Sequence, residues 1–233
     1  MKELITQIKW QFIILNRNKL IMVSVAITVI YGLVFLGLKD FGNMDKFLTL
    51  LIYNDPALIG LFFAGLSIIL EKNQQVLSAL FVSPMNRHYF LISKIIALSI
   101  VGTLCALAMV IAVRGFSFHY LLFISGVMGT CMFFSILGIY LVCFTTDFLQ
   151  FMLRSIPLLF FFSTPLLNYF ELTNIGLFYY TPIQGSLNLI INAYVDQPVQ
   201  SDLVYGFGSI LFWIPLAYIF VYKTFQSRMV QYT

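Results

Sequence analysis

The tripeptide Asn54-Asp55-Pro56 places a carboxylate and a proline inside an otherwise apolar run at residues 47–70. Proline removes a hydrogen bond from a helix, and a carboxylate within a membrane is energetically costly, so such residues often mark a transport pathway. In a second interpretation, Asn54 or Asp55 caps a helix that begins at Pro56, near the outer membrane surface. The sequence leaves both interpretations open and makes Asp55 and Pro56 candidate pathway residues.

The other residues able to support catalysis or metal binding are few and separated. His88 and His119 fall on opposite sides of the membrane in the topology derived below, so they cannot share a metal site. Cys105, Cys131 and Cys143 lie within apolar runs, which is typical of small core residues rather than of disulfides or metal ligands. The sequence has no G-x-S-x-G motif and no pair of carboxylates within one apolar run. We therefore expect no catalytic residue, cofactor or metal site in this chain.

The composition indicates a membrane protein. Of the 233 residues, 61% are hydrophobic, 17% are aromatic and only 9% are charged, whereas soluble domains have roughly 25% charged residues. The mean hydropathy is +0.95. A net charge of +4 suggests nucleic acid in a soluble chain, but here the charges fall between apolar runs, where they set membrane orientation. We expect one membrane domain over residues 1–233, in contact with lipid and with no nucleic-acid partner.

Six apolar runs are long enough to cross a bilayer as helices, which takes about 20 residues. They are residues 20–38, 47–70, 91–113, 120–143, 151–170 and 203–222. The basic residues assigned to the cytosolic side are Lys2, Lys9, Arg17, Lys19, Lys72, Arg87, Lys94, Arg154, Lys223 and Arg228, and those on the outer side are Lys39, Lys46 and Arg114. Ten basic residues against three is a positive-inside bias that predicts both termini in the cytosol.

The first 18 residues have the periodicity of an amphipathic helix. The apolar residues that share one face at 100° per residue are Leu4, Ile5, Ile8, Phe12 and Leu15. This pattern predicts a helix over residues 1–18 that lies in the cytosolic membrane interface. The alternative is that these residues simply extend the first span.

The outer connection at residues 171–202 is too long to be a turn. Its apolar runs are too short to cross a membrane, and Pro182 and Gly185 interrupt them. Thr181-Pro182 forms a suitable N-cap and first-turn pair, so we expect a helix near Pro182–Tyr194. The segment is predicted to be re-entrant, with Pro182 as a further candidate pathway residue.

The cytosolic connection at residues 71–94 contains a short amphipathic helix. Its apolar edge consists of Val76, Leu77, Leu80 and Phe81. Pro84 ends this helix, and Ser83 or Asn86 can cap the next one. A short amphipathic helix held between two spans suits docking into a groove of a soluble partner.

The same connection resembles the ABC-2 type permeases, which are membrane subunits of many bacterial ATP-binding cassette exporters. The positions at matching spacings are Glu71, Leu77, Ala79, Leu80, Ser83-Pro84, Arg87 and Lys94. Gln75 and Val76 replace the Gly-Thr pair usual in that family. The likeness also includes the interfacial N-terminal helix, the six spans and the re-entrant segment before the last span. Within the family, the short outer loops and the Asp-Pro pair are most similar to small drug-export permeases.

The resemblance implies an all-α permease of the bacterial cytoplasmic membrane that works as a dimer, with a second copy or a homologue. It implies that cytosolic ATPase subunits dock on the 71–94 hairpin and bind the ATP. The residues it assigns to ATPase coupling are Glu71, Leu77, Leu80, Phe81, Pro84, Arg87 and Lys94. The sequence has no G-x-x-x-x-G-K-[ST] phosphate loop, which agrees with an ATPase on another chain.

Two functions from other classes remain as alternatives. A secondary transporter or channel would work without an ATPase, but this class usually has interrupted spans in both halves of a repeat. Here the interruption at Asp55 has no clear counterpart in the second half. A membrane enzyme acting on lipids is the third alternative, and it lacks the paired catalytic groups that such chemistry needs.

Overall fold

The structure is a computed structural model that describes residues 2–37, 44–77, 86–195 and 197–229. Every regular element in these ranges is a helix. The all-α fold predicted from the sequence is therefore confirmed for the described part of the chain. Leu80, Phe81 and Pro84, which carry much of the predicted docking helix, lie outside the described residues.

The helices of the described residues are joined by connections of different lengths. In chain order they are α1 (Lys2–Arg17), α2 (Leu20–Gly37), α3 (Met44–Leu58), the π-helix η1 (Ile59–Phe63), α4 (Ala64–Asn73), α6 (Arg87–Arg114), α7 (Tyr120–Val142), α8 (Phe148–Phe162), α9 (Pro165–Tyr169), the 3-10 helix η2 (Gly176–Tyr180), α10 (Gln184–Asn192) and α11 (Gln200–Met229).

Five helical runs in the described part of the chain are long and apolar enough to cross a membrane. They are Lys46–Asn73, Arg87–Arg114, Tyr120–Val142, Phe148–Tyr169 and Gln200–Arg228. The first predicted span corresponds to α2, which meets the same criterion only together with α1, across a bend of 67°. All six predicted spans are thus helical, and five or six of them qualify as membrane crossings.

The junction between α1 and α2 is a sharp bend. Lys19, between the two helices, has a φ of 58°, in the left-handed region that ends helices. Because of the 67° bend, α1 is not a straight extension of α2. Its predicted place in the membrane interface stays a prediction. On its inner side α1 packs along α6, and Leu15 is buried there.

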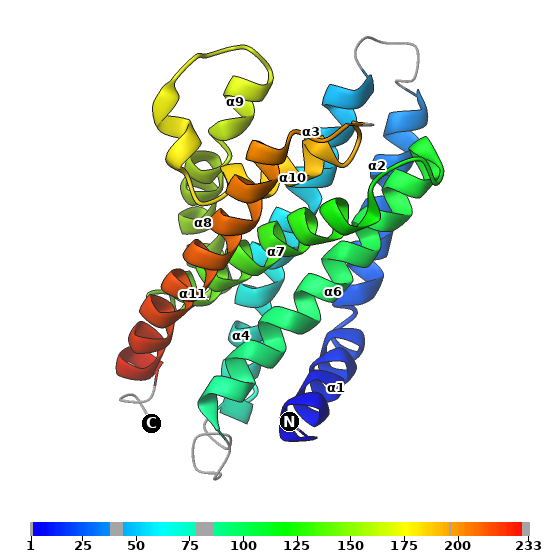
Figure 1. The fold of residues 1–233 in the computed structure, drawn as a ribbon. Helices are drawn as coiled ribbons and strands as arrows, with labels where there is room; N and C mark the ends of the chain where they lie inside the picture. Colours follow the sequence, from blue (N-terminus) through cyan, green and yellow to red (C-terminus); the bar gives the residue numbers. More distant parts are fainter. Residues whose placement is uncertain (1, 38–43, 78–85, 196, 230–233) are drawn as a thin grey trace.

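Helix α7 is the centre of the molecule. It crosses the bundle obliquely (Figure 1) and packs against α3, η1, α4, α6, α10 and α11. Two glycines allow α7 to pack closely against η1. A Cβ at Gly60 would lie 2.5 Å from the carbonyl oxygen of Cys131, and a Cβ at Gly138 would lie 2.3 Å from the carbonyl oxygen of Leu61. Small residues permit such backbone contact between membrane helices.

The helix ends group into two layers at opposite ends of the bundle. The start of α1, the end of α4, the start of α6 and the end of α11 lie at one end, whereas α9, η2 and α10 lie at the other (Figure 1). The first and last helices therefore begin and end on the same side, as the predicted topology requires.

The predicted helix start at Pro56 is wrong. α3 begins at Met44 and continues through Pro56, so neither Asn54 nor Asp55 caps a helix. Proline has no N–H for the carbonyl four residues earlier, and the ladder changes to π geometry from Ile59 onward. Neighbouring helices satisfy such local irregularities in membrane proteins. Asp55 therefore lies in the middle of a helical run instead of at its end.

Two other helix starts were predicted from capping residues. Asn86 caps α6 as predicted, because its side chain accepts a hydrogen bond from the backbone N–H of His88 at 3.0 Å. The helix predicted near Pro182–Tyr194 exists as α10 but begins later, after Ile183. Thr181 is not its cap, since its hydroxyl donates instead to the carbonyl of Phe178.

Candidate functional site: an apolar cavity with a buried carboxylate

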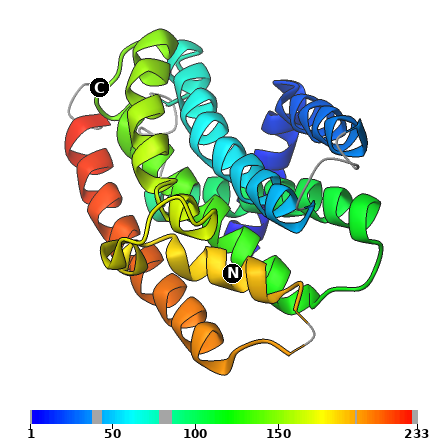
Figure 2. The same cartoon turned by 90° about the horizontal axis from the view of Figure 1, so that it is seen from above.

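An apolar cavity of about 400 Å³ lies between α2, the α3–η1–α4 run and α8. Its lining residues are Ile27, Ile30, Tyr31, Asp55, Leu58, Ile59, Phe62, Phe63, Leu66, Phe148 and Met152. Figure 2 shows α2 and α8 on either side of the α3–α4 run. The volume falls within the range of small-molecule sites, about 300–1,000 Å³. Ile30 is 57% exposed, so the cavity is open on the outer surface of the bundle.

Asp55 supplies the carboxylate among these lining residues. Its side chain is 1% exposed, and at about 1.5 Å per residue it lies about 14 Å along the helix from Lys46. Oδ2 is 3.3 Å from the hydroxyl of Thr28. Oδ1 is buried and has no hydrogen-bond partner among the described residues. The carboxylate is therefore held within the helical body with little compensation for its lost hydration.

The hydroxyl of Thr28 only partly replaces the hydration that the buried Asp55 carboxylate has lost. It lies 2.9 Å from the carbonyl oxygen of Ser24 and 3.3 Å from Oδ2 of Asp55. A hydroxyl has one hydrogen to donate, and the shorter contact is to Ser24. An ionised Asp55 thus shares at most one long hydrogen bond with this neighbour.

The π-helix gives the cavity its aromatic wall. Phe62 and Phe63 are successive residues at the end of η1, and both line the cavity. Phe62 also makes an edge contact with Phe151 of α8, at 6.2 Å between ring centroids. Single π-turns occur frequently at functional sites. In this protein the π-turn follows Pro56. Gly60 packs against α7, and Phe62 and Phe63 face the cavity between α2 and α8.

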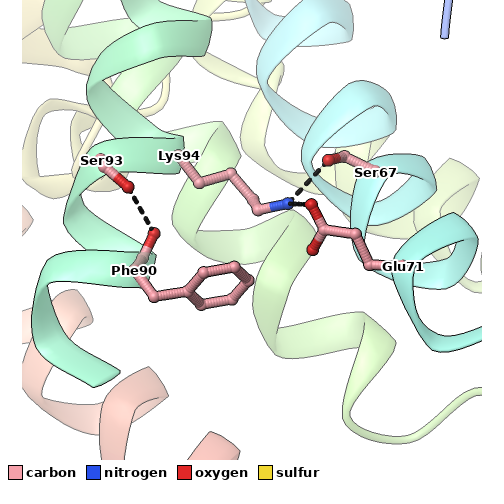
Figure 3. Close-up of polar contacts among 5 residues, drawn as sticks. All are labelled: Ser67, Glu71, Phe90, Ser93 and Lys94. Atoms are coloured by element: carbon pink, nitrogen blue, oxygen red, sulfur yellow. Dashed lines mark hydrogen bonds and ion pairs between the residues drawn. The ribbon is translucent and has the colours of Figure 1, made fainter. Parts of the chain in front are cut away.

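A buried ion pair joins the two ends of the 71–94 connection. Nζ of Lys94 in α6 lies 2.7 Å from Oε1 of Glu71 in α4 and donates to the hydroxyl of Ser67 at 2.7 Å (Figure 3). Both charged side chains are buried, and the ring of Phe90 lies below Nζ at 5.1 Å. Glu71 and Lys94, two of the predicted coupling residues, are thus brought together.

Helix α1 contributes two glutamines that the sequence analysis did not single out. Gln7 and Gln11 line a small cavity of about 200 Å³ beside the ion pair, together with Glu71. The Oε1 atoms of both glutamines and Oε2 of Glu71 are buried without a hydrogen-bond partner among the described residues. Buried polar groups of this kind usually bind ordered water. The spacing of four residues, which puts both glutamines on one face of α1, was the available signal.

Of the other predicted coupling residues, only Leu77 and Arg87 are among the described residues. Leu77 is buried, and Arg87 is the first residue of α6. Directly after Arg87, the ring of His88 stacks on Tyr222 of α11, with 3.7 Å between ring centroids, and its Nδ1 is 3.1 Å from the hydroxyl of Tyr218. The start of α6 is therefore tied both to α4 and to the end of α11.

Pro182 does not belong to the Asp55 cavity. It precedes α10, and its carbonyl oxygen accepts a hydrogen bond from Ser209 of α11 at 3.3 Å. Pro56 is buried in the bundle and does not line the cavity either. Of the three candidate pathway residues, the structure places only Asp55 on a cavity wall.

At the end of the bundle opposite to the chain termini, an exposed ion pair joins α3 to the segment after α9. Nζ of Lys46 lies 2.8 Å from Oε1 of Glu171. The Lys46 ammonium holds the pKa of the Glu171 carboxyl below its usual value. Glu171 is 82% exposed, so solvent screens this pair and it contributes little to stability.

The described residues contain no group of three or more His, Cys, Asp or Glu side chains able to hold a metal ion. His88 lies at the start of α6, and His119 lies just beyond its far end, before α7. The structure thus separates the two histidines by the length of a helix.

Helices that can cross a membrane, together with an apolar cavity that lies between them and opens on the surface of the bundle, are features of membrane transport proteins. The chain matches the fluoroquinolones export permease protein family over residues 2–233 and belongs to this family. It is 28% identical over 144 residues to the fluoroquinolones export permease proteins of two Mycobacterium tuberculosis strains, CDC 1551 / Oshkosh and ATCC 25618 / H37Rv. The alignment covers 61% of the chain and 60% of the length of each relative.

These matches confirm the resemblance to export permeases that the 71–94 connection indicated. The protein is therefore a multi-pass membrane protein that belongs to a family of drug-export permeases. The residues of the Asp55 cavity and of the ion pair remain candidates, because family membership assigns no role to individual side chains.

Proposed function

We propose that this chain is the membrane subunit of an ATP-binding cassette exporter, which moves a drug-like compound out across the bacterial cytoplasmic membrane. Membership in the export permease family over residues 2–233 is the observation that carries this proposal. The partner ATPase binds and hydrolyses ATP, since these 233 residues contain no phosphate-loop motif. Both termini face the cytosol, in agreement with the positive-inside bias.

The ATPase docks on the cytosolic connection between α4 and α6. This connection runs from the end of α4 to the start of α6, and the Glu71–Lys94 ion pair links the two helices at its base. A displacement of the docked segment therefore moves α4 and α6 together. Because α4 continues upward through η1 into α3, the motion reaches the helical run that carries Asp55.

The substrate is an aromatic compound that presents apolar surface to the cavity. The cavity walls are built from aliphatic and aromatic side chains, which bind such compounds by burial of apolar surface. The relatives in Mycobacterium tuberculosis are named fluoroquinolones export permeases, and fluoroquinolones have this character. We therefore take a fluoroquinolone as the first compound to test.

A second permease completes the transporter as a dimer. α8 and α11 leave most of their residues exposed, including Phe160 at 72% and Leu211 at 74%. In a membrane, such surfaces contact lipid or another helix. The resemblance to ABC-2 type permeases supports a second copy or a homologue as one of these contacts.

Co-purification with an ATPase tests the proposal. The chain is expressed with a candidate ATPase and isolated through a tag on the chain, and ATP hydrolysis is measured with and without ciprofloxacin. We expect the ATPase to co-purify and ciprofloxacin to raise its hydrolysis rate. Leu80→Asp, in the docking segment, should abolish co-purification without affecting membrane insertion. Leu172→Asp, at an exposed position at the other end of the bundle, is the matched control and should leave co-purification intact.

A proton-coupled secondary transporter is the second candidate, favoured by one observation. Asp55 is a buried carboxylate inside a helical run long enough to cross the membrane, and such residues serve as proton carriers in pumps and transporters. The two candidates differ in energy source. Substrate movement by the chain alone under an imposed pH gradient would establish the secondary transporter and reject the ATP-driven exporter.

A further inference from the structure

We infer that the Asp55 cavity selects substrates that carry a positive charge, such as a protonated amine attached to an aromatic body. The buried carboxylate recognises the cation, and the apolar walls hold the rest of the compound. This inference rests on the proposed export of a drug-like compound and names the feature by which that compound is recognised.

The carboxylate of Asp55 lacks the partners that a buried charge needs. Oδ1 has no hydrogen-bond partner among the described residues, and Oδ2 competes with a backbone carbonyl for the hydrogen of Thr28. Of the described residues that line the cavity, none is basic. An isolated buried carboxylate is strongly unfavourable unless it is paired. A cationic ligand supplies the missing donor and the missing opposite charge together.

The neighbouring aromatic rings fit the same ligand. Tyr31, Phe62 and Phe63 line the cavity with Asp55, and the faces of aromatic rings attract cations in addition to apolar groups. A ligand with an ammonium group and an aromatic body can place its charge beside the Asp55 carboxyl group and its rings against these side chains. A neutral or anionic compound of the same shape gains only the apolar contacts.

Asp55 lies far from the ion pair at the base of the proposed docking segment. The Glu71–Lys94 pair at the base of the docking segment is already matched in charge, whereas Asp55, about 24 Å away along the helix at 1.5 Å per residue, is not. The unmatched charge therefore lies in the cavity, and the matched pair lies in the part proposed to contact the ATPase. The two sites therefore differ in role. The unpaired carboxylate can bind a ligand, whereas the ion pair links two helices.

A matched pair of compounds tests the inference on the full-length chain in lipid nanodiscs. Ciprofloxacin carries a basic piperazine nitrogen, and N-acetyl-ciprofloxacin has the same aromatic body without that charge. Binding of each radiolabelled compound is measured by equilibrium dialysis at pH 7. We expect the wild-type chain to bind ciprofloxacin about tenfold or more tightly than its acetylated form, as a charge-assisted hydrogen bond provides.

Three variants locate the preference. Asp55→Asn keeps the shape of the side chain and should bring the ratio of the two affinities close to one. Asp55→Glu keeps the charge and should retain a larger ratio than Asp55→Asn. Met152→Ala, at an apolar wall position, should weaken the binding of both compounds by a similar factor and leave the ratio unchanged.

The inference is overturned if wild type does not bind ciprofloxacin, if it binds both compounds equally, or if Asp55→Asn and Asp55→Glu give the same ratio. The comparison of the two compounds on wild type needs no variant, so equal binding overturns the inference even if Asp55→Asn fails to fold, and Asp55→Glu then locates the preference. These measurements use no ATPase. Failure of the ATP-driven mechanism would leave the preference intact, and loss of the preference would leave ATP-driven export intact.

Discussion

Nζ of Lys94 lies 2.7 Å from Oε1 of Glu71, although the two residues are 23 positions apart in the sequence. Both side chains are buried between α4 and α6. The segment that separates them in sequence is the proposed docking site for the ATPase. The ion pair therefore links α4 to α6 at the base of this segment.

The first prediction concerns the stability provided by this pair. Lys94→Met leaves the Glu71 carboxylate buried and unpaired, which should lower the free energy of unfolding by about 3–5 kcal/mol. Glu71→Leu combined with Lys94→Met removes both charges and should restore most of the loss, because apolar side chains often replace a buried ion pair without cost. Thermal unfolding in detergent, followed by intrinsic fluorescence, measures both variants.

The exposed pair Lys46–Glu171 provides the control for this experiment. Its N–O distance is 2.8 Å, close to that of the buried pair, but Glu171 is 82% exposed. Lys46→Met should therefore leave the melting temperature nearly unchanged. A double variant of Glu71 and Lys94 as unstable as the single variant would show that the two residues do not act as a pair.

A second prediction tests the contact between η1 and α7. Gly60→Ala would place a Cβ 2.5 Å from the carbonyl oxygen of Cys131, so the helices must separate, at a cost of about 1–3 kcal/mol. Gly32→Ala, in α2, has nothing within 4 Å of its Cβ and should be neutral or stabilising, by up to about 1 kcal/mol. Equal melting temperatures for the two variants would contradict the close approach.

The third prediction tests whether the Asp55 cavity is occupied by the transported compound. Cys105 and Cys131 are buried, whereas Cys143 is partly exposed, so a Cys143→Ser background suppresses unwanted labelling. Met152→Cys should then react with N-ethylmaleimide, and ciprofloxacin should slow the reaction severalfold. Leu104→Cys, exposed on α6 away from the cavity, should react at a rate independent of ciprofloxacin. Equal protection of both positions would place the compound elsewhere.

A fourth prediction concerns the helix that begins directly after the docking segment. Asn86→Ala removes the side-chain acceptor for the N–H of His88 and should destabilise the chain by about 1 kcal/mol. Asn86→Asp keeps an acceptor at this position and should melt close to wild type. If both variants melted alike, the cap would contribute nothing to the start of α6.

Hydropathy was sufficient to predict which segments are helical, but not where the helices end. The spans predicted at residues 91–113 and 203–222 correspond to helices Arg87–Arg114 and Gln200–Met229. Charged and polar residues such as Arg87 and Lys223 continue a helix beyond the apolar stretch, because the backbone ladder does not depend on hydropathy. A prediction from apolar runs therefore finds the membrane-crossing part and misses the ends.

The functional residues were predictable one by one, but their relationships were not. Asp55 is recognisable as a carboxylate in an apolar run, yet the sequence allowed it to be a helix cap, since proline occurs both at helix starts and at kinks. Glu71 and Lys94 were each predicted as coupling residues without their ion pair. Gln7 and Gln11 were missed, because a glutamine buried toward another helix has the same periodicity as one facing water.

Transport in proteoliposomes tests the central claim most directly. The chain is reconstituted with its ATPase in inside-out orientation, and uptake of ciprofloxacin is followed after addition of ATP. We predict uptake that requires both proteins and hydrolysable ATP, and that continues when a protonophore removes any pH gradient. Uptake by the chain alone, driven by a pH gradient and indifferent to ATP, would contradict the account.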